Sequence, residues 1–205
     1  MKTISELKQY GSDSYFAVFE DGETLKTVFS VVADHALYSG RELTEEEYEA
    51  VKTASELGRC KARAMRIVSA RACSEMELYE KLLQKGETEQ NAAESVAYMK
   101  GLHLLDDRDY ARMLVRHYGG KGYGAARIKS ELYHRRVPKE LWDEALEEMP
   151  RQDDAIDRFI NSRLRGQEPD RKELKRVTDA LLRRGFSYDE IRSAVMRYSS
   201  GIEDD

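Results

Sequence analysis

The chain has 205 residues, of which 40% are hydrophobic and 36% are charged, and only three of them are prolines. This composition is typical of a folded, helix-rich protein and excludes a disordered chain. No apolar run approaches the roughly 20 residues that span a bilayer, and the N-terminus has no signal-peptide pattern. The two cysteines, Cys60 and Cys73, have no CxxC spacing and are expected to be thiols in a reducing compartment. We therefore expect a cytoplasmic protein with no membrane partner.

The charge is distributed unevenly along the chain. The net charge is -5 at pH 7, yet residues 1–57 hold five basic and twelve acidic side chains, and residues 101–136 hold eight basic and four acidic ones. The acidic N-terminal part disfavours tight binding to bare duplex DNA, because that affinity comes largely from cations placed on phosphates. The basic middle suits a phosphate-bearing partner, such as a protein surface already loaded with nucleic acid.

The N-terminal residues predict a small β module. Two β-forming runs, at 15–19 and 25–29, flank an Asp-Gly pair at 21–22. Such a pair is a hairpin signal, because a tight turn of this kind requires positive φ. A short helix is predicted at 32–38, ended by Gly40.

A long helix follows this module. Thr44 and Glu47 have the spacing of a capping box, in which each side chain accepts a hydrogen bond from the other residue's backbone N–H. The helix is predicted to reach Ala70. We interpret residues 1–58 as one module that contains the hairpin and the start of this helix.

The sequence repeats itself from about residue 60. The segments 81–86, 131–136 and 180–185 share one pattern of charged and apolar residues, at separations of 50 and 49 residues. Each belongs to the second of three short helices, which are stable only when packed together. The predicted units are 59–104, 105–149 and 150–200, followed by an acidic tail at 201–205. Their helices are predicted at 60–70, 75–85 and 88–100, at 107–118, 125–136 and 138–148, and at 153–164, 171–184 and 188–198.

The expected fold is therefore mainly α. It is an elongated tandem array of three three-helix repeats, with a small N-terminal module that contains a β-hairpin. Capping boxes at 74–77 and 187–190 mark helix starts in two of the repeats. Gly86 and Gly185 fit C-terminal helix caps, and Arg136 takes the same place in the middle repeat.

A stripe of arginines lies on the first helix of the middle repeat. Arg108, Arg112 and Arg116 are four residues apart and so share one helix face, where their guanidinium groups could pair with phosphate oxygens. The alternative is a solvated face without a partner. Asp106 or Asp107 is expected to cap this helix. The face predicted to be buried comprises Tyr110, Met113, Leu114 and His117.

A glycine-rich loop, residues 119–124, follows this helix. It matches the letters of a dinucleotide-binding fingerprint, but that site requires a preceding strand, and here a helix precedes the loop. Two readings stay open, a plain turn and a close backbone approach to a phosphate or a partner. Tyr123 is a candidate for base stacking, and Trp142 is expected in the core. The next helix adds cations at Arg127, Lys129, Arg135 and Arg136, with Ile128 and Leu132 on its buried side. The third repeat adds Arg171, Lys172, Lys175, Arg176, Arg183 and Arg184.

The sequence contains no catalytic constellation. Its four histidines have no metal-ligand spacing, and no nucleophile motif or phosphate-binding P-loop is present. We therefore expect a protein that is not an enzyme and has neither a cofactor nor a metal.

Three blocks of the sequence resemble the bacterial RecX family. They are Ser74-x-x-Glu77-Leu78-x-x-Lys81-Leu82-x-x-Lys85-Gly86, Leu105-Asp106-Asp107-x-x-Tyr110-Ala111, and Lys121-Gly122-Tyr123-Gly124-x-x-Arg127-Ile128-x-x-Glu131-Leu132. The resemblance covers about residues 60–200, and the N-terminal hairpin resembles an extension of some longer members. It implies a non-catalytic regulator of the RecA recombinase in recombination and DNA repair. Such proteins lie in the groove of the RecA–single-stranded DNA filament and interfere with filament extension, ATP hydrolysis and strand exchange.

For such a regulator, we predict a monomer whose basic middle contacts acidic RecA groups and DNA phosphates. Reversing Arg112 and Arg116 to Glu is expected to keep the helical circular-dichroism signal and to abolish inhibition. Two alternatives stay open. A self-standing helical DNA-binding protein predicts steep salt dependence, and a generic helical adaptor predicts indifference to the reversal. The predicted contact residues are Arg108, Arg112, Arg116, Lys121, Arg127, Lys129, Arg135 and Arg136.

Overall fold

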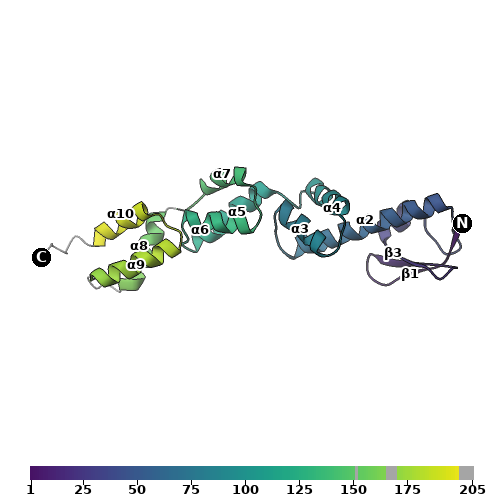
Figure 1. Cartoon of the computed structure of the whole chain (residues 1–205), viewed down its shortest axis with the longest axis horizontal. Coiled ribbons are helices and arrows are strands. Elements are labelled where there is room, and N and C mark those ends of the chain that lie inside the picture. Colours follow the sequence, from purple (N-terminus) through teal and green to yellow (C-terminus); the bar gives the residue numbers. More distant parts are fainter. Residues whose placement is uncertain (151, 165–169, 199–205) are drawn as a thin grey trace. The chain divides into compact units, whose positions relative to one another are not determined.

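The computed structural model describes residues 1–150, 152–164 and 170–198, and the acidic tail predicted at 201–205 lies outside them. The chain divides into two compact units, Met1–Leu105 and Asp106–Asp205. The described residues form ten α-helices, one short 3-10 helix and four strands, with all of the strands near the N-terminus (Figure 1). The fold is mainly helical with a small N-terminal strand module, as the sequence predicts.

The N-terminal module contains a four-stranded antiparallel sheet with the strand order β3-β2-β1-β4. The predicted hairpin is confirmed as β2 (Ser14–Phe19) and β3 (Thr24–Val28), and Gly22 in its turn has a φ of 85°. Two strands go beyond the prediction, β1 (Lys2–Gln9) and β4 (Glu42–Leu43). The pairing of β1 with β2 shifts register between Ile4 and Glu6, and this irregularity interrupts the alternation by which a strand is recognised.

The helix predicted at 32–38 lies earlier, and this correction has a local cause. Helix α1 spans Phe29–Asp34. Ala36 then takes a left-handed φ of 46°, and the backbone N–H of Leu37 donates to the carbonyl of Val32 at 2.9 Å. These are the features of a helix C-terminal cap, accompanied here by the buried side chain of Leu37. The chain has therefore left the helix before it reaches Gly40.

Helix α2 (Glu45–Ala70) contacts both the sheet and the first three-helix repeat. Its predicted capping box is confirmed, with Thr44 Oγ1 accepting from the backbone N–H of Glu47 at 3.1 Å. Tyr48 packs in the core of the sheet module, whereas Cys60 packs in the core of the repeat. Gly58 is required for the approach to β3, because a Cβ there would lie 2.6 Å from a methyl group of Val28.

The first repeat adds α3 (Glu75–Gln84) and α4 (Glu89–Gly101) to the end of α2. Leu78, Leu82 and Met99 are fully buried in its core. Cys60 and Cys73 are buried thiols, and burial raises the pKa of the Cys60 thiol. Both cysteines therefore act as small apolar residues in this core.

The second repeat consists of α5 (Asp107–Gly120), α6 (Ala125–His134), a 3-10 turn η1 (Lys139–Leu141) and α7 (Trp142–Leu146). Ile128 and Leu132 are fully buried, as predicted. The buried face of α5 differs from the prediction, since Met113 and His117 are exposed. Its buried apolar side chains are Tyr110, Ala111, Leu114 and Val115, so Ala111 and Val115 take the places that the prediction gave to Met113 and His117. Trp142 is half-buried and donates from Nε1 to the carbonyl of Val137 at 3.0 Å.

The third repeat consists of α8 (Gln152–Leu164), α9 (Arg171–Arg183) and α10 (Tyr188–Tyr198). Val177 and Leu181 are buried between the helices. The predicted capping box of α10 is confirmed, because Ser187 and Glu190 each accept a hydrogen bond from the other's backbone N–H. A further capping box, formed by Asp170 and Glu173, begins α9.

One turn recurs after the second helix of each repeat. Gly86, Arg136 and Gly185 follow α3, α6 and α9 with φ values of 84°, 58° and 87°. In each case the next backbone N–H donates to a carbonyl of the preceding helix. Arg136 therefore occupies a left-handed position for which glycine is better suited, as the sequence alignment of the repeats predicts.

Candidate functional site

The predicted basic stripe begins at a well-capped helix terminus. Asp106 Oδ1 accepts from the backbone N–H groups of Arg108 and Asp109 at 2.9 Å and 3.0 Å. These bonds lower the pKa of Asp106, which places a carboxylate at the positive end of the α5 dipole. The cap sets the start of α5 and with it the rotation of the three arginines around the helix.

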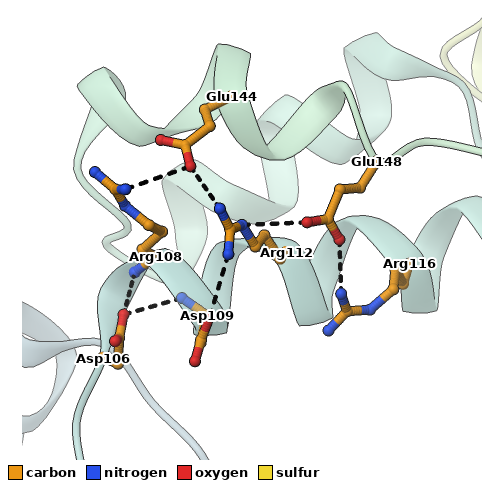
Figure 2. Close-up of polar contacts among 7 residues, drawn as sticks. All are labelled: Asp106, Arg108, Asp109, Arg112, Arg116, Glu144 and Glu148. Carbon is orange, nitrogen blue, oxygen red and sulfur yellow. Dashed lines mark hydrogen bonds and ion pairs between the residues drawn. The ribbon is translucent and has the colours of Figure 1, made fainter.

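The three arginines form an ion-pair ladder with Glu144 of α7 and Glu148, which follows that helix (Figure 2). Arg112 Nη2 lies 2.7 Å from Glu144 Oε1, and Arg112 Nε lies 3.2 Å from Glu148 Oε1. Arg116 Nη1 is 2.6 Å from Glu148 Oε2, and Arg108 Nη1 is 3.6 Å from Glu144 Oε1. We call this set of five side chains the arginine ladder. It holds α5 against α7 by alternating charges.

The ladder determines how many guanidinium N–H donors each arginine of the stripe has left for a partner. Arg112 is its central member, with 31% of its side chain exposed, and the hydrogen bond that it donates to Glu144 raises its pKa. Arg108 and Arg116 each expose 59% of their side chains and contact the glutamates through one nitrogen. Because a guanidinium carries five N–H donors, these outer two arginines keep donors available for an anionic partner. Arg112 instead uses its donors mainly within the protein, on Glu144 and Glu148.

The other predicted cations lie apart from the ladder. Arg127 pairs with Glu131 on its own helix at 2.7 Å, and Lys129 lies 3.5 Å from Asp143. The remaining three are Lys121, which lies over the Tyr118 ring, the half-buried Arg135, and Arg136, which lies over the Tyr133 ring. The eight residues therefore do not form a single row.

The glycine-rich loop joins the second repeat to the third. The backbone N–H of Gly124 donates to the carbonyl of Arg184 at 2.9 Å, and that of Ala126 donates to Gly185 at 3.1 Å. A Cβ on Gly124 would lie 2.3 Å from the Gly185 carbonyl oxygen, and one on Gly185 would lie 2.3 Å from the Arg127 nitrogen. The loop therefore makes a close backbone approach within the chain itself, and the predicted approach to a phosphate or a partner stays a prediction.

Tyr123 takes part in the same contact. Its ring centroid lies 6.0 Å from that of Tyr118, and the guanidinium of Arg184 lies 5.7 Å from it. The half-buried ring thus packs within the protein, and this contact occupies the residue that the sequence suggests for base stacking.

Three family models match consecutive segments of the chain. They describe the first, second and third three-helix domains of RecX and match residues 60–99, 106–146 and 152–195. The regulatory protein RecX of Vibrio campbellii is 32% identical over 137 residues, which is 66% of this chain and 88% of the relative. The chain belongs to the RecX family.

The similarity to some relatives also extends over the N-terminal module of this RecX-family chain. The regulatory protein RecX of Caldanaerobacter subterraneus is 26% identical over 197 residues, covering 94% of this chain and 98% of the relative. A crystal structure of regulatory protein RecX superposes with a TM-score of 0.73 at 22% identity, over 96% of this chain and 100% of that one. RecX from Lactobacillus salivarius gives a TM-score of 0.65 at 20% identity, over 71% and 98%. These structures share the fold.

The relatives are named as regulatory proteins, and the role of this RecX-family chain is likewise regulatory. Within residues 1–150, 152–164 and 170–198, no three His, Cys, Asp or Glu side chains are grouped as a metal site. No helix in the same ranges has the length and apolar character to cross a membrane.

The RecX fold also brings together residues that the sequence did not single out. Arg158 and Phe159 of α8 line one cavity with Lys121 and Arg184, although these residues come from three separate segments. The partners of the arginine stripe, Glu144 and Glu148, were missed as well. The available signal was their spacing of four residues, which matches the spacing of the arginines.

Proposed function

We propose that this RecX-family protein binds the RecA–single-stranded DNA filament as a monomer and inhibits filament extension, ATP hydrolysis and strand exchange. The observation that carries the proposal is the series of three RecX three-helix domains along residues 60–195. A tandem array of this kind suits a polymeric partner, because each unit can meet a similar site on a successive protomer. Once one unit is bound, the next contacts are intramolecular and therefore strengthened.

The contact surface is proposed on the exposed cations of the second repeat. Arg108 and Arg116 keep free donors at the two ends of the arginine ladder, and Lys121 is exposed beside the glycine loop. Arg112 acts mainly by positioning these neighbours. The proposed contact residues are the predicted set, Arg108, Arg112, Arg116, Lys121, Arg127, Lys129, Arg135 and Arg136.

The acidic N-terminal module supports a filament rather than bare DNA as the partner. Residues 1–57 have more than twice as many acidic as basic side chains, and this charge repels a phosphate backbone. Among the exposed acidic residues of this module, Glu45 and Glu46 lie in the first turn of α2. A protein-coated DNA strand offers basic and polar groups to such a surface, whereas naked DNA does not.

The test is the rate of RecA ATP hydrolysis on single-stranded DNA as this protein is added, from amounts far below one per RecA. Inhibition at these low ratios is expected, because one bound copy can stop growth of a filament of many protomers. An unchanged rate at excess protein, with RecA from the same source, would contradict the proposal. The matched variant carries Arg108→Glu and Arg116→Glu, and we expect it to inhibit far less. Full inhibition by this variant would instead favour a generic helical adaptor.

A further inference from the structure

One edge of the N-terminal sheet carries unpaired backbone groups. Strand β3 is the last strand on that side, and in an antiparallel pair only every second residue exchanges hydrogen bonds with its neighbour. The backbone N–H of Phe29 donates to the carbonyl of Asp13, so the odd-numbered residues of β3 face β2. The backbone N–H and C=O groups of Thr24 and Lys26 therefore point away from the sheet, and they have no partner among the described residues.

The charge on this edge selects what can pair with it. Thr24 and Lys26 are exposed, and such an edge can add an extended segment of another chain as a further strand. A second copy of β3 is a poor occupant, because antiparallel pairing centred on Lys26 would place two lysines opposite each other. The ammonium of Lys26 lies 5.7 Å from the Phe16 ring centroid and forms no ion pair in the described part of the chain. The edge therefore favours a segment with a carboxylate opposite Lys26.

A groove begins where this edge ends. It has a volume of about 450 Å³, and its lining includes Val28, the last residue of β3, together with Gly58 and Lys61 of α2 and Tyr98 of α4. The exposed ring of Tyr98 and the half-buried Met65 form apolar parts of its wall. Because Val28 belongs to both the edge strand and the groove, one extended segment can occupy the two in succession.

The groove is also cationic. The ammonium of Lys61 lies 4.8 Å from the Tyr98 ring centroid, and Arg66 donates from Nε to a carbonyl one turn earlier in α2 at 3.3 Å. Neither cation forms an ion pair with another residue that the structure describes. The one carboxylate of the lining, Asp13, accepts from the backbone N–H of Phe29 at 3.2 Å. Uncompensated positive charge therefore lies beyond the end of β3 as well as beside it.

We infer that the edge of β3 and this groove bind an extended, acidic segment of a partner protein. Backbone pairing with β3 holds the segment, and Lys26, Lys61 and Arg66 select carboxylates along it. A phosphodiester chain is not the ligand, because it lacks the alternating N–H and C=O groups that pair with a strand edge. The acidic character of residues 1–57 does not extend into the groove, where Asp13 is the one carboxylate. The inference does not depend on the proposed function, since the contact requires neither RecA nor DNA.

The test measures binding of the full chain to a fluorescein-labelled peptide by anisotropy. The peptide has about eight residues, the length of an ordinary strand, and glutamate alternates with valine in it. We expect Lys26→Glu with Lys61→Glu to weaken binding by about tenfold or more, because repulsion replaces attraction at both places. The matched control is Lys139→Glu with Arg192→Glu, which makes the same charge change at exposed residues of the second unit. It should bind within about twofold of the unaltered chain.

Two altered peptides separate backbone pairing from charge attraction. Methylation of the amide nitrogens removes the donors but keeps the carboxylates, and replacement of glutamate by lysine keeps the donors but reverses the charge. Both peptides should bind about tenfold more weakly or worse. Undiminished binding of either peptide would overturn the inference, and so would equal binding by the double variant and its control.

Thermal unfolding shows whether each variant is folded, and Lys26→Gln with Lys61→Gln should give a smaller loss in the same direction. A single-stranded oligothymidylate should not displace the peptide, and displacement at equal concentration would identify the groove as a nucleic-acid site instead. Because this assay contains no RecA, its result is independent of the ATP-hydrolysis assay, so either proposal can fail while the other stands.

Discussion

Arg112 and Glu144 lie 2.7 Å apart although 32 residues separate them in the sequence. This ion pair reduces the net positive charge that the basic middle of the chain presents in the folded protein. Residues 101–136 have an excess of cations, but Glu144 and Glu148 lie just beyond that window and neutralise part of the excess in the folded protein. A charge count along the sequence therefore overstates the positive field of α5. Among the described residues, Lys121, Arg158 and Arg184, at the junction of the second and third repeats, form no ion pair and contact only rings and backbone carbonyls.

The first prediction concerns the arginine ladder. Reversing Arg112 and Arg116 to Glu places two new carboxylates beside Glu144 and Glu148, so repulsion replaces attraction between α5 and α7. The midpoint of thermal unfolding, followed by circular dichroism, should fall by several degrees. Well below this midpoint the helical circular-dichroism signal should still be kept, as the sequence predicts.

The charge swap provides the control for this prediction. Adding Arg108→Glu, Glu144→Arg and Glu148→Arg to the double reversal restores alternating charges along the whole ladder and should recover most of the lost stability. Lys139→Glu with Arg192→Glu changes the net charge of the chain by the same amount at exposed positions outside the ladder. If the ladder reversal melts no earlier than this control, the ion pairs contribute nothing to the fold.

The second prediction concerns the backbone contact between the repeats. Gly124→Ala should destabilise the docking of the third repeat by about 1–3 kcal/mol, because its Cβ would overlap the Gly185 carbonyl. Faster amide hydrogen exchange in α8 to α10 is the expected readout. Gly120→Ala is the matched control, since a Cβ at this helical position meets nothing within 4 Å. Equal exchange rates in the two variants would show that the close approach is not required.

The parts of the fold that were predicted correctly depend on local patterns. The capping box of Thr44 and Glu47 and the left-handed turns at Gly86 and Gly185 involve residues a few positions apart, so their geometry follows from sequence. Strand β1 was missed because its register shift after Ile4 disturbs the alternation of buried and exposed residues.

The candidate site was harder to predict because its contacts are distant in sequence. Arg184 reaches the carbonyl of Gly122 across 62 residues, and nothing near either residue specifies the other. The glycine spacing did indicate a close backbone approach, but the partner backbone comes from the third repeat. Similarly, the arginine stripe was evident, while its glutamate partners required knowledge of how α7 packs on α5.

The third prediction concerns the left-handed turn of the second repeat. Arg136 has a φ of 58°, a conformation that costs a non-glycine residue roughly 1–2 kcal/mol. Arg136→Gly should therefore stabilise the protein by about 0.5–1 kcal/mol after the added freedom of the unfolded chain is subtracted. Gly86→Ala, in the equivalent turn of the first repeat, should have the opposite effect. Urea unfolding measures both, and a loss of stability in Arg136→Gly would mean that the arginine side chain outweighs the backbone strain.

The fourth prediction is a loss of stability at high pH that originates in the N-terminal module. Burial and a hydrogen bond to Glu23 raise the pKa of Tyr48 to about 12, whereas tyrosine in an unfolded chain titrates near 10. The protonated hydroxyl is thus favoured in the folded state, so its contribution is complete below pH 10 and is lost as the pH rises towards 12. The pKa of Lys2 is raised by its hydrogen bonds to Asp21 and Glu23, which acts in the same direction.

Urea unfolding between pH 8 and pH 11 measures this loss, and the absorbance of tyrosinate reports the ionisation itself. Tyr48→Phe removes the phenol but keeps the ring that packs at 86° to Phe19, so it should be less stable at pH 8 and lose less stability at alkaline pH. The two proteins should therefore differ by up to about 1.4 kcal/mol in the stability that they lose between pH 8 and pH 11. Identical pH dependence in both proteins would place the alkaline transition elsewhere, and the Cys60 thiol, whose pKa is raised by burial, would then be the next group to test.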